Sequence, residues 1–218
     1  MTTTINRHPD DANLMSFAAG VLAEPLAAVV ASHLALCPQC RAEMRTLRTL
    51  GGVLLADDAV AGSRDLPYLT PAAASAPIAD SAALAAKIRP NGLPAPLAIK
   101  YGITLETLAW RWLGPGVWHH RLPLSPGVGG DLRLLKIAAG RKMPEHGHGG
   151  TELTLVLDGA YSDASGTFRA GDVQDVDDHL QHQPLVDPSL GCVCLVASEQ
   201  PARFKGFFSR VLQPWTGM

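Results

Sequence analysis

The stretch GRKMPEHGHGGTELTLVLDG, residues 140–159, brings two histidines and a glutamate close together in the sequence. His146 and His148 are two positions apart, so on a strand their side chains point to the same side. The glycines after His148 permit a turn, and Glu152 opens the next apolar run. Two imidazoles and a carboxylate suit zinc, iron, manganese or nickel. The stretch therefore predicts a metal site between two strands.

Short strand-like runs surround this stretch from Leu97 to the end of the chain. LAIKYGI, TLAWRWL, VWHHRLPL, LRLLKIAAG, TFRAGDV and CVCLVASE are apolar segments broken by Gly, Pro and Asp. Many short strands at nearly regular spacing are typical of a β-sandwich or β-barrel. We expect this architecture for the C-terminal part of the chain.

Written as G-x5-H-x-H-x3-E-x6-G, the stretch at residues 140–159 resembles the first motif of the cupin family. The resemblance implies a cupin domain over residues 97–215. The second cupin motif, G-x5-P-x-G-x2-H-x3-N, can be laid on Gly171 and then places its histidine on His182. Its other positions are degenerate, because they hold Asp177, His179 and Val186.

The cupin resemblance implies one metal with four ligands. His179 is the rival of His182 for the fourth position, and Asp178 and Glu145 are candidates to hydrogen-bond the ligands. A metal-free cupin that retains its histidines is the alternative. We expect zinc or another divalent metal on His146, His148, Glu152 and His182.

The N-terminal part carries a second cluster, in SHLALCPQC at residues 32–40. On a helix, His33 and Cys37 lie one turn apart on the same face, and Cys40 follows across a proline break. His8 precedes the first helix and can supply a fourth ligand. These residue types in tetrahedral reach predict zinc on His8, His33, Cys37 and Cys40. A thiol redox pair, or two core cysteines with an incidental histidine, are the alternatives.

Three helices are expected over residues 9–61, because apolar positions recur at helical spacing and Pro25 and Pro38 interrupt the pattern. The stretch that follows is rich in Ala and Pro and predicts a linker at about residues 60–79. Residues 80–88 could form one short amphipathic helix. Such a helix is marginal alone and needs a surface to pack on.

The first 88 residues resemble the zinc-binding domain of bacterial anti-sigma factors, which pairs H-x3-C-x2-C with an upstream histidine. In that family a three-helix bundle is tied by zinc and a fourth helix clamps the sigma factor, a role that residues 80–88 would fill. The anti-sigma-like domain joined to a cupin resembles the ChrR family of anti-sigma factors. This resemblance implies an α + β two-domain protein, with residues 1–88 and 97–215 as its domains.

The ChrR resemblance also implies a function. We expect a cytoplasmic regulator, not an enzyme, that inhibits an extracytoplasmic-function sigma factor. The cupin would be the sensory domain, releasing the sigma factor on oxidative stress such as singlet oxygen or peroxides. The alternative is a metal-dependent cupin enzyme, a dioxygenase or isomerase, with the N-terminal bundle as a docking domain.

The composition and the early sequence limit which classes of partner the protein can bind and which cellular compartment it occupies. Eighteen Lys and Arg stand against 20 Asp and Glu, so the chain lacks the basic excess of a nucleic-acid-binding protein. No early stretch reads as a secretory signal or a membrane span.

Cys192 and Cys194 are two apart on an expected strand. The pair has two interpretations, thiols that respond to oxidants near the metal or small buried strand residues, and we favour the second.

Overall fold

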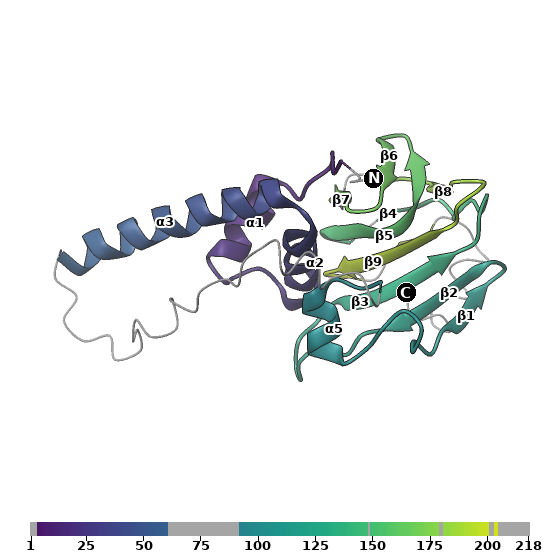
Figure 1. Cartoon of the computed structure of the whole chain (residues 1–218), viewed down its shortest axis with the longest axis horizontal. Coiled ribbons are helices and arrows are strands. Elements are labelled where there is room, and N and C mark those ends of the chain that lie inside the picture. The colour runs from purple at the N-terminus through teal and green to yellow at the C-terminus, as the bar shows by residue number, and fades with distance from the viewer. Residues whose placement is uncertain (1–3, 61–91, 148, 179–180, 201–202, 205–218) are drawn as a thin grey trace.

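The computed structural model describes residues 4–60, 92–147, 149–178, 181–200 and 203–204 (Figure 1). It combines N-terminal helices with a C-terminal β-sandwich, which confirms the predicted α + β class. Among the described residues, none of the helices combines the length and the apolar character that crossing a membrane requires.

The N-terminal part forms the three expected helices, which contact one another. Asp10 caps the first by accepting a hydrogen bond from the Asn13 backbone N–H at 2.6 Å. Pro25 lies in the first turn of the second, where its missing N–H costs nothing. Cys37 is extended and ends that helix, so the third helix starts at Pro38. The helices are α1 (Asp11–Ala18), α2 (Glu24–Leu36) and α3 (Pro38–Val60).

The C-terminal part holds ten strands in the described residues. They are β1 (Arg111–Gly114), β2 (Val117–Arg121), β3 (Asp131–Ile137), β4 (His146–Gly147), β5 (Glu152–Asp163), β6 (Gly166–Arg169), β7 (Val173–Val176), β8 (Leu185–Val186), β9 (Cys192–Ser198) and β10 (Arg203–Phe204). Neighbours run antiparallel in the order β1-β2-β3-β9-β5-β6, with β7 and β8 also on β5 and β10 on β4.

The long strand β5 belongs to both layers of the sandwich. Its first half pairs with β7 and its second half with β6 and β8, while β9 follows it through a bulge after Val156. Gly159 lies just beyond the bulge with φ of 75°, and a Cβ there would come within 2.0 Å of the Gly191 carbonyl oxygen. The last glycine of the 140–159 pattern is thus required by a close backbone approach.

One expected strand is a helix. Residues around LAIKYGI form α5 (Ala95–Tyr101), and the first strand begins only at Arg111. Pro96 in the first turn and Gly102 in the left-handed conformation at the C-cap favour a helix. The helix buries Leu97 in the core and leaves Ile99 exposed. The short apolar run was therefore wrongly assigned to a strand.

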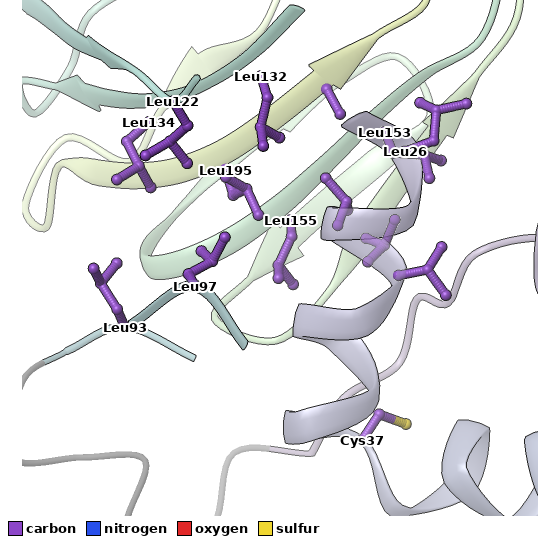
Figure 2. Close-up of a cluster of buried hydrophobic side chains, with 14 of the residues drawn as sticks. Leu26, Cys37, Leu93, Leu97, Leu122, Leu132, Leu134, Leu153, Leu155 and Leu195 are labelled. Atoms are coloured by element: carbon purple, nitrogen blue, oxygen red, sulfur yellow. The ribbon is translucent and has the colours of Figure 1, made fainter. Parts of the chain in front are cut away.

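Helix α2 packs on the sandwich, and the helices and strands share one buried cluster. Leu26, Val29 and Val30 on α2 are almost fully buried, as are Leu155 and Leu195 on β5 and β9. Figure 2 shows the sheet leucines gathered along α2, with Cys37 at the end of the helix away from Leu26. Helix α3 extends away from the sandwich (Figure 1).

Several predicted segments lie outside the described residues. They include the linker beyond Val60, the helix at residues 80–88, His148 and His179, and the end of the cupin range after residue 204.

Candidate metal centres

The structure brings His8, His33, Cys37 and Cys40 together, with one ligand atom from each within 4.8 Å of the others. We call this set the His/Cys cluster. His8 Nδ1 lies 3.4 Å from His33 Nε2 and 3.3 Å from Cys40 Sγ. Cys37 Sγ is 3.5 Å from His8 Nδ1, and His33 Nε2 is 3.3 Å from Cys40 Sγ. These four side chains could hold a metal ion.

The spacing of the His/Cys cluster fits zinc. With Zn–S near 2.3 Å and Zn–N near 2.0–2.1 Å, the edges of a tetrahedron are about 3.3–3.8 Å. The donor-to-donor distances of 3.3 to 3.5 Å fall in that range. Two sulfurs and two imidazole nitrogens are also the donors of closed structural zinc sites.

Local structure explains how the cluster forms. His33 and Cys37 are one turn apart at the end of α2, and Cys40 lies in the first turn of α3, where its backbone N–H donates to Cys37 Sγ at 3.4 Å. His8 arrives from the extended segment before α1. Arg41 closes the end of α2 by donating from Nη1 to the carbonyls of Leu34 and Ala35.

Protonation states at the cluster suit a metal. Burial lowers the pKa of His33 to about 4, so the imidazole is neutral near pH 7. Its Nδ1 donates to the Gly171 carbonyl at 3.0 Å, which leaves the lone pair of Nε2 facing the cluster. Burial and the neighbouring Cys37 raise the pKa of Cys40 to about 12. Without a metal this thiol therefore keeps its proton.

A second cluster lies inside the sandwich, where His146, Glu152 and His182 also place ligand atoms within 4.8 Å of one another. We call this set the His/Glu cluster. His146 Nε2 is 3.1 Å from His182 Nε2, and the two residues form a backbone bridge. The structure thus brings His182 to the predicted site, while His148 and His179 lie outside the described residues.

Sequence reasoning missed the carboxylate that orients His182. His182 Nδ1 lies 2.9 Å from Oδ2 of Asp163, at the end of β5. Burial raises the pKa of Asp163, but hydrogen bonds from Gln174, Ser165 and His182 outweigh it and leave the pKa below its usual value. The carboxylate is therefore ionised and accepts from His182. No motif marks this residue, because the strand pairing alone brings it to the site.

The His/Glu cluster opens into a cavity of about 260 Å³. The cavity is lined by polar side chains, among them Thr154, Tyr161 and Gln174. It is also lined by apolar side chains, which include Ile137 and Val196. The cavity combines a donor set for a divalent metal with room for a small molecule.

The cysteines of β9 are buried beside this cavity, and Cys194 forms part of its lining. Their sulfurs are 3.3 Å apart. The hydrogen bond with Cys192, together with burial, raises the pKa of Cys194 well above its usual value. Cys194 is therefore a protonated thiol in the lining of the His/Glu cavity. Because a buried, protonated thiol is unreactive, these contacts support a packing role.

Comparisons with known proteins agree with this architecture. Residues 100–202 match the family model of the ChrR cupin-like domain. Over 214 residues the chain is 40% identical to the anti-sigma-E factor ChrR of Cereibacter sphaeroides, covering 97% of this chain and 98% of the relative. The matched relative is a regulator and not an enzyme.

A solved structure gives the same result. The crystal structure of Rhodobacter sphaeroides SigE in complex with the anti-sigma ChrR matches with a TM-score of 0.71 and 39% identity. The match covers 89% of this chain and 99% of that one. Similarity on this scale, over helices and sandwich together, shows the family. The chain belongs to the ChrR family of anti-sigma factors.

Proposed function

We propose that this protein binds an extracytoplasmic-function sigma factor through its N-terminal helices and keeps it from RNA polymerase. The observation that carries the proposal is the similarity over 89% of the chain to a ChrR solved in complex with SigE. The activity belongs in the cytoplasm, where sigma factors meet RNA polymerase.

Helix α3 offers the described surface best suited to such a partner. Leu50, Val53, Leu54 and Leu55 are 54 to 62% exposed along its distal half. Apolar side chains gathered on one exposed helix favour a protein interface over a solvated surface. The helix projects from the sandwich (Figure 1), so a partner can reach it. The segment at residues 80–88 is proposed as a second element of the clamp.

Zinc in the His/Cys cluster is proposed to stabilise the N-terminal helices. The bundle is small, and a closed site with two sulfur and two nitrogen donors contributes folding free energy directly. Without the metal, the buried thiol of Cys40 and the neutral imidazole of His33 are joined at 3.3 Å only by a weak S–H···N hydrogen bond, which stabilises the bundle much less than zinc would.

The sandwich is proposed as the sensory domain, with zinc or another divalent metal on His146, His148, Glu152 and His182. The trigger proposed from the family resemblance is oxidative stress of the singlet-oxygen or peroxide type. A trigger of any kind must favour the sigma-free conformation over the bound one, since a signal shifts an equilibrium only by its differential effect on two states.

Co-expression with the host's extracytoplasmic-function sigma factors tests the proposal. We expect the tagged full-length chain to recover one sigma factor in a stoichiometric complex and to reduce transcription from that factor's promoter. Cys37→Ala should abolish both effects, whereas His146→Ala should keep binding but block release by the oxidant. A soluble, metal-loaded chain that recovers none of the sigma factors would overturn the proposal.

A further inference from the structure

Strand β7 has contacts in the surroundings of both clusters. Successive side chains of a strand point to opposite faces. Gln174 pairs with Thr154 of β5 and lines the inner cavity, as Thr154 does. Val173 and Asp175, one position to either side, contact the N-terminal segment through the hydrogen bonds described below. One short strand therefore contacts both the cavity inside the sandwich and the N-terminal segment that leads into α1.

On the inner face, Gln174 is tied to the partner of His182. Its Nε2 donates to Asp163 Oδ2 at 2.7 Å, and its Oε1 accepts from the Tyr161 hydroxyl at 2.8 Å. The same Oδ2 accepts from His182 Nδ1. A histidine that binds a metal through Nε2 must carry its proton on Nδ1, so metal binding fixes Asp163 as acceptor and Gln174 as donor.

On the outer face, the turn before β7 holds the segment that delivers His8. Asp172 Oδ1 accepts from the backbone N–H groups of Asn6 and Arg7 at 2.8 and 3.1 Å. The backbone N–H of Val173 donates to the Arg7 carbonyl at 3.1 Å. His8 is the next residue, so these bonds set its position in the His/Cys cluster.

The same turn orients the other histidine of the cluster, and β7 itself holds the start of α1. The carbonyl of Gly171 accepts from His33 Nδ1, and Asp175 Oδ2 accepts from the Asp10 backbone N–H at 3.0 Å and from Asn13 Nδ2 at 2.9 Å. Gly171 has φ of 97°, and a Cβ there would lie 2.6 Å from Ile5 Cγ1. Any side chain at position 171 would therefore clash with the N-terminal segment, because the turn and the segment pack so closely.

From this geometry we propose that β7 and its preceding turn, residues 171–175, couple metal occupancy of the His/Glu cluster to the metal affinity of the His/Cys cluster, with Gln174 as the positioning residue. Loss of the inner metal releases the Nε2 end of His182, so the ring and the Asp163 and Gln174 side chains bonded behind it are held less tightly. The strand then holds His8 and His33 less firmly. The inference deepens the proposed function, because it supplies a route from the sensory domain to the helices. A severalfold lower metal affinity still leaves a structural zinc site loaded when no chelator is present. His146→Ala is therefore expected to keep sigma binding, and it has no inner metal left for the oxidant to act on.

Cobalt in the full-length chain gives a readout for the His/Cys cluster alone. Cysteine sulfur bound to cobalt absorbs strongly in the near ultraviolet, and of the two clusters only the His/Cys cluster contains cysteine. We would load the chain with cobalt, add excess chelator, and follow the decay of this band. His146→Ala, which removes an inner ligand, should speed the decay about fivefold or more, the usual lower range of site–site coupling.

A double-mutant comparison then isolates Gln174. In a Gln174→Met background, His146→Ala should change the decay rate less than twofold, because the inner cluster no longer reaches β7. Val196→Ala is the control: Val196 lies opposite Thr154 on β9 and lines the same cavity, but its apolar side chain forms no hydrogen bond to a ligand residue, so the fivefold effect should stay intact. An equal effect of His146→Ala in the Gln174→Met and parent backgrounds, or no effect in the parent, would overturn the coupling.

A second pair of variants covers the case in which Gln174→Met fails to fold. Asp172→Ala should speed cobalt loss, and His146→Ala should add little to it. Asp187→Ala removes a comparable turn-capping carboxylate, which accepts from Ser189 and Leu190, and should do neither. These measurements need no sigma factor. If the two clusters are coupled but the chain binds no sigma factor, only the proposed function is contradicted. If the chain binds a sigma factor but the clusters are not coupled, only this inference is contradicted.

Discussion

His182 Nδ1 lies 2.9 Å from Oδ2 of Asp163, and the Asp163 side chain is completely shielded from solvent. A buried carboxylate on the far nitrogen of a ligand histidine fixes its tautomer and raises its basicity. The same oxygen accepts from Gln174. Asp163 therefore orients the His182 ring, whose Nε2 faces His146.

Replacing Asp163 by Asn tests this control. Asp163→Asn keeps the shape but removes the charge, so metal affinity of the His/Glu cluster should fall about 10–100-fold. Competition against a chelating dye would measure this affinity, provided that only the metal bound beyond the one equivalent in the His/Cys cluster is counted. Asp158→Asn, on the exposed side of the same strand, should leave the affinity unchanged. Equal affinities for parent and Asp163→Asn would contradict the orienting role.

Removal of one sulfur from the His/Cys cluster should cost both metal and stability. Cys37→Ser leaves three good ligands, so metal analysis should show one zinc fewer per chain, and thermal denaturation should begin at a lower temperature. His120→Ala is the control, because its ring bonds only the Ala109 carbonyl at the surface among the contacts described. A Cys37→Ser protein with unchanged zinc content would show that the cluster does not hold the metal.

Zinc binding to the His/Cys cluster should depend on pH with a defined sign. The pKa of Cys40 is raised to about 12, so zinc must displace its proton throughout the physiological range. The pKa of His33 is lowered to about 4, so this ring has no proton to lose at Nε2 above that pH. Apparent zinc affinity should therefore rise at least about tenfold per pH unit from pH 6 to 8. Calorimetry in buffers of different ionisation enthalpy would count the released protons, and a pH-independent affinity would contradict the assignment.

The sequence predicted best what local spacing determines. His33 and Cys37 share a helix face because they are four apart, and His146 and Glu152 flank one turn, so local spacing alone points to the two clusters. The structure groups His8, His33, Cys37 and Cys40 in one and His146, Glu152 and His182 in the other, while His148 stays a prediction. Asp163 and the turn at Gly171 were missed because only strand pairing brings them to the clusters. The seven-residue apolar run LAIKYGI has no clear period, so the prediction of a strand there is wrong. Pro96 in the first turn and Gly102 at the C-cap favour the helix α5.

The packing of α2 on the sandwich has a testable consequence for unfolding. Leu26 on α2 is 1% exposed and lies in the cluster that also contains Leu153 and Leu155. Leu26→Ala should lower the free energy of unfolding by about 2–5 kcal/mol.

Tryptophan fluorescence during urea unfolding reports this change, because all four tryptophans lie at residue 110 or beyond. A shift of their transition by a substitution on α2 means that helices and sandwich unfold together. Val21→Ala, at a position 76% exposed, is the control and should not shift it. An unmoved tryptophan transition for Leu26→Ala would mean that the two parts unfold independently.

The exposed face of α3 yields the most direct test of sigma binding. Leu54 is 59% exposed, so Leu54→Ser should change the free energy of unfolding by no more than about 0.5 kcal/mol. If the face is the interface, the same substitution should weaken the complex about tenfold or more, since burying a leucine side chain contributes about 1.5–3 kcal/mol. Val21→Ser changes a residue that is 76% exposed between α1 and α2, outside the proposed face, and should bind as the parent does. Titration of labelled sigma factor would separate the two variants. Equal dissociation constants for both would move the interface away from α3 and leave the segment at residues 80–88 as the next to test.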